Sequence, residues 1–244
     1  MSKKLFIVSD VHGFYAALMK ALAEGGFDPD NEEHIFVSCG DLFDRGEDNL
    51  SVFSFVRGLE RKILIKGNHD DNLYKALCSG FLTEADVENE TCRTVTELLG
   101  DGAVGDDLCI NTEGFAHRVG EIKGLIEGMV DYYETEKYVF THGWLPLLFE
   151  GRYPHIDPDW RNASRDEWDF ARWVEWQQTY EVGAMLSDKV IVCGHRSTTL
   201  GHMFDPMRAN DCSDIFYGEG MIALDAGTVR SGRVNLLILD ESEW

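Results

Sequence analysis

Short apolar, β-branched runs that end in polar, glycine-containing loops recur along the chain, and this pattern is typical of strands in a buried sheet. Seven such runs predict strands at Leu5–Ser9, His34–Cys39, Lys62–Ile65, Tyr138–Thr141, Val190–Cys193, Met221–Leu224 and Val234–Leu239. Phe14, Leu18 and Leu22 recur at the spacing of one helical face. We therefore predict helices over Phe14–Glu24 and, by similar spacing, Asn49–Leu59, so that the first third of the chain is β-α-β-α-β.

Two longer segments interrupt this pattern. Residues 71–137 are predicted to form a mostly helical insert, and residues 145–185 form a second insert that is rich in tryptophan and arginine. Within the second insert, Trp168, Arg172 and Trp176 are spaced as neighbours on one helix. Both segments are therefore expected to add helices beside the sheet.

Length and composition limit the class of protein. The 244 residues are 44% apolar, which suffices for a sizeable core, and no repeat or proline-rich linker divides them. We expect one domain over residues 1–244, with the strands after Gly220 closing the same sheet. The chain carries 44 acidic and 22 basic side chains, a net charge of −22. This charge repels nucleic-acid phosphates and anionic lipids, so we expect neither nucleic acid nor membrane as a partner.

Three features favour a cytoplasmic protein. The six cysteines include no CxxC pair of the kind found in zinc or redox sites, and we interpret them as thiols in a reducing cytosol. The N-terminal apolar run is short and is interrupted by Asp10 and His12, unlike a signal peptide or membrane anchor. No apolar stretch approaches the roughly 20 residues that span a bilayer.

Side chains that can carry chemistry follow the ends of five successive predicted strands. They are Asp10 and His12, then Asp41, Asp44 and Arg45, then Asn68, His69 and Asp70, then His142, and finally His195. Open α/β sheets place their sites at the carboxyl ends of their strands. The first two residues are two positions apart, so their side chains point to the same side of an extended segment.

Each of these residues taken alone fits a turn or a satisfied polar group. Polar side chains at five strand ends together indicate a metal site instead. The mixture of carboxylate, amide oxygen and imidazole nitrogen suits manganese, iron or zinc rather than calcium, and it lacks the thiolates of a structural zinc site. The ligands suffice for two divalent ions, and we expect manganese, with iron or zinc as alternatives.

The motifs SDVHG, GDLFDRG, GNHD, THGW and GHRST occur in that order, and with them the sequence resembles the calcineurin-like metallophosphoesterases. The DRG ending of the second motif narrows the resemblance to the phosphoprotein phosphatase branch, which holds serine/threonine phosphatases and bacterial diadenosine tetraphosphatases. The resemblance extends from Lys4 to about Gly201 and through ALDAGTVRSGRVNLLIL near the end, outside the two inserts. It implies an α/β fold, a layered β-sandwich with flanking helices.

Carried over position by position, the resemblance implies two metal sites and three catalytic residues. The first ion takes Asp10, His12 and Asp41, and the second takes Asn68, His142 and His195, with Asp41 bridging the two. His69 matches the family's proton donor, Asp44 the carboxylate that orients it, and Arg45 a phosphate-binding arginine.

The sequence departs from the family pattern at three positions. Ser9 replaces the usual first glycine, and Asp70 stands where many protein phosphatases carry glutamate. Trp144 follows HisGly where another glycine is common, so the substrate groove is expected to have a different shape.

A second phosphate-binding arginine is also expected from the resemblance, but no motif identifies it. Arg172, Arg161 and Arg196 are the candidates. Arg172 has an alternative role, since it can stack on the aromatic residues of its segment and pair with Glu175 or Asp169.

The chemistry of hydrolysis fits these roles. Two divalent ions about 3.5 to 4 Å apart can hold a bridging water, lower its pKa and clamp the phosphoryl oxygens for in-line attack. Asp41 suits the bridging position, because a carboxylate can offer one oxygen to each ion. His69, held as imidazolium by Asp44, can protonate the leaving alkoxide, and Arg45 can offer its donor fork to the phosphate.

Two substrate classes remain open for such a phosphohydrolase. Phosphoproteins are favoured by the strong negative charge of the chain, which repels a polyanion such as diadenosine tetraphosphate. Nucleotides are favoured by the tryptophans between Tyr153 and Tyr180, because purines stack on aromatic faces. We favour a serine/threonine protein phosphatase. A catalytically silent metal-binding scaffold is a third hypothesis, although no ligand or proton donor is missing.

Overall fold

The computed structural model describes residues 3–203 and 212–243, and most of its strands form two sheets. The first sheet has the order β11-β1-β2-β3 and contains β1 (Lys4–Val8), β2 (His34–Ser38), β3 (Lys62–Leu64) and β11 (Leu237–Asp240). The second has the order β4-β5-β8-β10-β9 and contains β4 (Tyr132–Glu134), β5 (Tyr138–Thr141), β8 (Val190–Cys193), β9 (Phe216–Gly218) and β10 (Met221–Ala223).

Each sheet contains three neighbouring parallel strands, with an antiparallel strand on one side of them in the first sheet and on both sides in the second. Strands β1, β2 and β3 are parallel in the first sheet, as are β5, β8 and β10 in the second. The expectation that the strands after Gly220 close a single sheet is wrong. Strand β10 joins the second sheet beside β8, whereas β11 returns to the first sheet and pairs antiparallel with β1.

The alternation of side chains along β1 explains how the layers stack. Leu5 and Ile7 pack into a core that lies between the sheets and also contains Phe140 of β5. Phe6 and Val8 point to the opposite face, where they join the core formed with the helices. Because both faces of this strand are buried, its sequence is a continuous apolar run.

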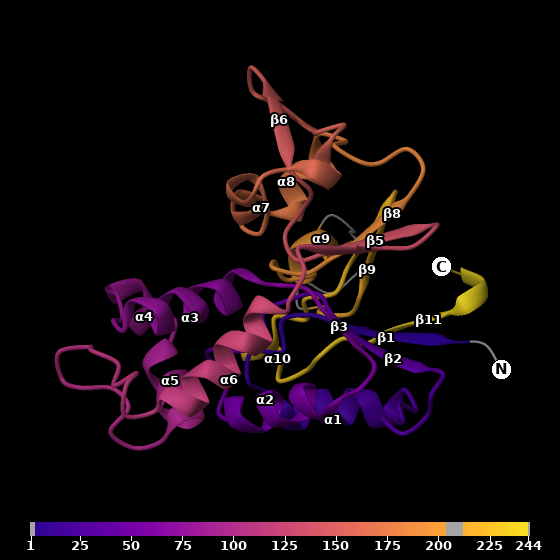
Figure 1. Ribbon diagram of the computed structural model, residues 1–244. Coiled ribbons are helices and arrows are strands. Elements are labelled where there is room, and N and C mark those ends of the chain that lie inside the picture. The colour runs from indigo at the N-terminus through magenta and orange to yellow at the C-terminus, as the bar shows by residue number, and fades with distance from the viewer. Residues whose placement is uncertain (1–2, 204–211, 244) are drawn as a thin grey trace.

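Helices cover the outer face of the first sheet and extend beyond one end of it (Figure 1). They are α1 (Tyr15–Glu24), α2 (Asn49–Gly58), α3 (Asn68–Ser79), α4 (Glu84–Glu88), α5 (Thr91–Leu99) and α6 (Ala116–Glu127). The two helices predicted in the first third of the chain are confirmed, as is the mostly helical character of residues 71–137. None of the helices in the described ranges is long and apolar enough to cross a bilayer.

The segment after β5 covers the outer face of the second sheet (Figure 1). It contains the hairpin of β6 (Leu147–Glu150) and β7 (Tyr153–Ile156), a 3₁₀ turn (Trp160–Asn162), and the helices α7 (Arg165–Ala171) and α8 (Trp176–Glu181). Two short helices, α9 (Thr199–His202) and α10 (Thr228–Ser231), follow later in the chain. The prediction of a single helix through Trp168, Arg172 and Trp176 is wrong, because α7 ends before Arg172 and a new helix, α8, begins at Trp176.

Most tryptophans of this region are core residues. Trp144, Trp160, Trp168 and Trp176 are each at most 4% exposed, and they pack with Val139 and Ile191 of the second sheet. The indole of Trp144 donates to the Ala184 carbonyl at 3.2 Å. Trp144 therefore fills the core of this region, and its burial there removes a large apolar surface from water.

Candidate metal centre

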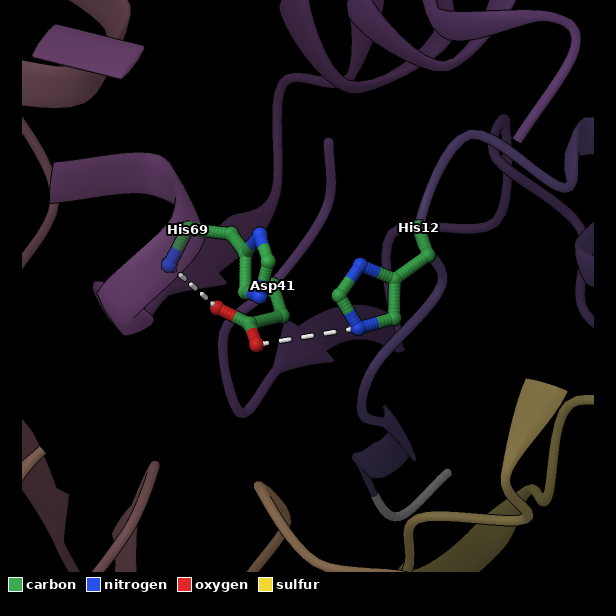
Figure 2. A group of neighbouring side chains, drawn as sticks. All are labelled: His12, Asp41 and His69. Atoms are coloured by element: carbon green, nitrogen blue, oxygen red, sulfur yellow. Dashed lines mark hydrogen bonds and ion pairs between the residues drawn. The ribbon is translucent and has the colours of Figure 1, made fainter. Parts of the chain in front are cut away.

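Among the described residues, two groups of side chains could hold a metal ion, and Asp41 belongs to both. One group is His12, Asp41 and His69, the other is Asp41, His142 and His195, and the donor atoms within each lie within 4.8 Å of one another. Figure 2 shows Asp41 between His69 and His12: Oδ1 accepts the His69 backbone N–H at 2.9 Å, and Oδ2 lies 3.7 Å from His12 Nε2. The same Oδ2 lies 3.3 Å from His142 Nε2. Asp41 thus connects the two groups.

Asn68 completes the second group. Its Oδ1 lies 2.8 Å from His142 Nε2 and 2.9 Å from His195 Nδ1. Asn68 is the first residue of α3, whereas the two histidines follow β5 and β8 of the other sheet. The centre therefore lies where the carboxyl ends of strands from both sheets meet, and its oxygen and nitrogen donors suit a divalent transition metal.

Backbone carbonyls orient two of the imidazoles. The Nδ1 of His12 donates to the Phe43 carbonyl at 3.0 Å, and the Nδ1 of His142 donates to the Cys39 carbonyl at 2.8 Å. Each of these bonds leaves Nε2 facing Asp41. Histidines that bind metals commonly use their second nitrogen in this way, which fixes the orientation of the ring.

The protonation of the centre follows from burial and from Asp41. Burial lowers the pKa of His12 to about 3, and burial together with the charge of His142 lowers the pKa of His195 to about 3. Burial opposes the ionisation of Asp41, but His142 and His69 outweigh it and hold the pKa of Asp41 well below its ordinary value. An ionised carboxylate and neutral imidazoles are the forms that bind metal ions.

Asp10 is buried beside the two groups without belonging to either. Its carboxylate accepts from Ser9 Oγ at 2.5 Å and from the His195 backbone N–H at 3.0 Å. Burial and the nearby Asp225 carboxylate raise the pKa of Asp10 well above its ordinary value. Ser9, which replaces the family's glycine, thus supplies a hydrogen bond to one of the expected ligands.

Asp70 holds the loops after β2 and β3 together. Its carboxylate accepts the backbone N–H groups of Asp41 and Gly67, both at 2.9 Å, and that of Leu42 at 3.0 Å. A side chain at position 67 would collide with Asp41, because a Cβ there would lie 2.1 Å from Asp41 Oδ1. Glycine therefore lets the third loop approach the centre closely.

His69, Asp44 and Arg45 lie at one side of the centre. His69 Nδ1 lies 2.9 Å from Asp44 Oδ2, and both side chains are buried. Arg45 Nη2 lies 2.8 Å from His69 Nε2, and its Nη1 lies 3.3 Å from His12 Nε2. Because a guanidinium only donates hydrogen bonds, His69 Nε2 accepts in this arrangement.

The backbone is strained at these strand ends. Six residues have left-handed φ values between 49° and 73°: Asp10, His12, Asp41, Asp44, Arg45 and His195. Such values are uncommon for residues other than glycine and cluster at functional sites, where the surrounding structure holds them.

Each candidate for the second phosphate-binding arginine has a carboxylate partner. Arg172 pairs with Asp131 and Asp169, Arg196 with Glu175 at 3.0 Å, and Arg161 with Glu134 at 2.9 Å. Arg172 is buried, whereas the side chain of Arg196 is 44% exposed. The ion pair between Arg172 and Asp169 was predicted from the sequence as the alternative to phosphate binding by Arg172.

Two neighbours of the centre are not evident from the sequence. Trp173 is 51% exposed, and its ring lies edge-on to that of His195 with 6.1 Å between the centroids. Thr91, the first residue of α5, is buried and donates to Asp44 Oδ2 at 3.0 Å. Neither residue follows a strand, so only the tertiary contact reveals it.

Comparison with known families identifies the class of protein. The model of the calcineurin-like phosphoesterase family matches residues 3–222, and the chain belongs to this family. The layered α/β fold expected from the resemblance is confirmed.

Curated relatives match over short stretches of the chain. A stretch of 77 residues is 36% identical to serine/threonine-protein phosphatase 1 of Salmonella typhimurium and covers 32% of this chain and 34% of that protein. A stretch of 67 residues is 42% identical to a symmetrical bis(5'-nucleosyl)-tetraphosphatase of Aeromonas hydrophila and covers 27% of this chain and 24% of that protein. The matches thus span about a third and a quarter of these relatives.

Solved structures resemble the whole chain. A putative diadenosine tetraphosphatase superposes with a TM-score of 0.57 at 16% identity, covering 98% of this chain and 90% of that one. A protein serine/threonine phosphatase of Saccharomyces cerevisiae gives 0.53 at 14% identity, covering 91% and 67%. At these identities the similarity establishes the fold.

Proposed function

We propose that the protein is a metal-dependent hydrolase that cleaves phosphate monoesters. Six residues would hold two divalent ions, with manganese as the expected metal: Asp10, His12 and Asp41 for the first, and Asn68, His142 and His195 together with Asp41 for the second. The observation that carries this proposal is the position of Asp41, which belongs to both groups of donors. When bound, the ions supply an activated water and positive charge beside the phosphoryl group.

The residues at the side of the centre supply the remaining chemistry. His69 protonates the leaving oxygen through Nε2, while Asp44 holds its Nδ1 and stabilises the charged ring. Arg45 hydrogen-bonds to His69 Nε2 at 2.8 Å. In the proposed reaction its guanidinium turns to the phosphate of the bound ester, which frees His69 Nε2 to donate its proton. The family membership of the chain supports this assignment of a hydrolase.

A serine/threonine phosphoprotein is the favoured substrate class. A polyphosphate needs several free cations, but the described candidates Arg161, Arg172 and Arg196 already have carboxylate partners. The net charge of −22 adds a general repulsion of polyanions. Arg196, whose side chain is half-exposed, is the better candidate for a second phosphate contact, whereas Arg172 is held in buried ion pairs.

A dinucleoside polyphosphate is the alternative substrate, and Trp173 favours it. This exposed indole beside His195 offers a surface on which a base can stack. The buried Trp160, Trp168 and Trp176 cannot do so, which weakens the argument drawn from the tryptophan content.

The test is a phosphate-release assay with manganese on phosphoserine and phosphothreonine peptides and, in parallel, on diadenosine tetraphosphate. Asp41→Asn is the blank, because it removes the shared carboxylate. Turnover of peptides that is absent from the blank supports the protein phosphatase, and nucleoside diphosphate formed from the dinucleotide supports the alternative. Manganese binding without turnover of either substrate would support a silent scaffold and overturn the proposed activity.

A further inference from the structure

The carboxylate of Asp44 has two partners, and both contact the same oxygen. Oδ2 accepts from His69 Nδ1 at 2.9 Å and from Thr91 Oγ1 at 3.0 Å. All three side chains are buried, with Asp44 and Thr91 fully inaccessible to solvent. The other oxygen of Asp44 is buried and has no hydrogen-bond partner among the described residues. Within the described residues, His69 and Thr91 therefore supply the only hydrogen bonds to this carboxylate.

The direction of these hydrogen bonds is fixed by chemistry. An ionised carboxylate can only accept, so the Thr91 hydroxyl donates to it. Hydrogen bonds to a charged acceptor in a water-free environment are stronger than those between neutral groups. Thr91 thus holds Oδ2 of Asp44 where it meets His69.

The helix that carries Thr91 is itself fixed to the loop that carries Asp44. Arg93 donates to the Gly46 carbonyl at 2.9 Å and also to the Arg45 carbonyl. Glu97 accepts the backbone N–H of Asn49 at 2.8 Å and its side-chain amide at 3.0 Å. Contacts along two turns of α5 therefore keep the Thr91 hydroxyl in place relative to Asp44.

We propose that Thr91 is a positioning residue that acts through Asp44 to orient His69 for proton donation. This inference rests on the proposed function, in which His69 is the proton donor. It assigns a role in the reaction to the helical insert, which lies between Asn68 and His142 in the sequence and contributes none of the proposed ligands.

Thr91→Val tests the inference, because it removes the hydroxyl while nearly keeping the shape of the side chain. The kcat of the manganese-loaded enzyme is measured on para-nitrophenyl phosphate, which has a good leaving group, and on phenyl phosphate, which has a poorer one. We expect Thr91→Val to slow phenyl phosphate by about tenfold, the value of one hydrogen bond to a charged group, and para-nitrophenyl phosphate much less. Thr91→Ser, which keeps the hydroxyl, should restore most of the difference.

Thr94→Val is the matched control. Thr94 is equally buried on the same helix, but its hydroxyl reaches the Glu90 carbonyl instead of Asp44. It should leave the ratio of the two rates unchanged. Equal slowing of both esters by Thr91→Val, or no slowing, would overturn the inference. If Thr91→Val does not fold, Thr91→Ala is measured in its place with the same two outcomes.

Two further variants separate this inference from the proposed function. His69→Asn should discriminate between the esters more strongly than any Thr91 variant. If it does not discriminate, the proton-donor role fails, and with it the basis of the inference. If it does and Thr91→Val does not, the role of Thr91 alone is wrong. In an Asp44→Asn background, Thr91→Val should cause no further change in the ratio of the two ester rates, because the proposed effect of Thr91 on His69 is transmitted only by Asp44.

Discussion

The Asp70 carboxylate accepts the backbone N–H of Asp41 at 2.9 Å, so the first turn of α3 holds the residue that the two donor groups share. Asp70 is fully buried and makes two further bonds of the same kind. The position of Asp41 thus depends on a side chain that belongs to neither donor group.

Asp70→Asn should weaken both the fold and the metal centre. One of the three backbone donors would face an amide N–H instead of an oxygen, which costs about 1 to 3 kcal/mol of unfolding free energy. Displacement of Asp41 should weaken manganese affinity by about tenfold or more. Urea unfolding and metal titration measure the two effects. Asp166→Asn, at an exposed position in the first turn of α7, is the control and should change neither.

Manganese binding should release protons. The carboxylates of Asp41 and Asp10 outweigh burial and raise the pKa of His142 to about 9, so this imidazole is protonated at neutral pH before it binds a metal. Affinity should therefore rise with pH up to about 9, with at least one proton released per chain near neutral pH. Calorimetry in buffers of different ionisation enthalpy measures this number. Affinity that is independent of pH would contradict the assignment of His142 as a ligand.

Arg172→Met should destabilise the protein without changing the chemistry of each folded molecule. It leaves Asp131 and Asp169 without their buried partner, at a cost of about 2 kcal/mol. Arg196→Ala, at a half-exposed pair, should change stability by less than about 0.5 kcal/mol but raise KM for phosphoesters. Loss of substrate binding in a normally stable Arg172→Met variant would show that Arg172 contacts phosphate instead.

Gly194→Ala should disturb Asp10. A Cβ at position 194 would lie 2.2 Å from Asp10 Oδ2 and 1.9 Å from Ser9 Oγ, so these side chains must move. Manganese affinity and activity should fall together. Gly120→Ala is the contrasting change, because a Cβ within α6 meets no atom within 4 Å there, and it should stabilise the helix by about 0.5 to 1 kcal/mol. Unchanged metal affinity in Gly194→Ala would argue against Asp10 as a ligand.

The sequence by itself determined the first two helices, the polar residues after the strands, and seven strands, namely β1, β2, β3, β5, β8, β10 and β11, but not β4, β6, β7 and β9. These features are local: an apolar run such as Leu5–Ser9 must be buried, and the parallel arrangement brings the ends of such strands to one edge. For that reason Asp41, His142 and His195, which are far apart in the chain, could be predicted to meet. Their order in five motifs also identified the family.

The tertiary structure alone decided the rest. The division of the last strands between the two sheets, β10 beside β8 and β11 beside β1, is a long-range pairing that no local pattern encodes. The burial of Trp144 and the pairing of Arg172 with Asp131 depend on which surfaces meet, and the same side chains would look functional in isolation. Thr91 contacts Asp44 across 47 positions of sequence, because α5 packs on the loop after β2. Contacts of this kind arise from packing between elements, which periodicity and motifs do not describe.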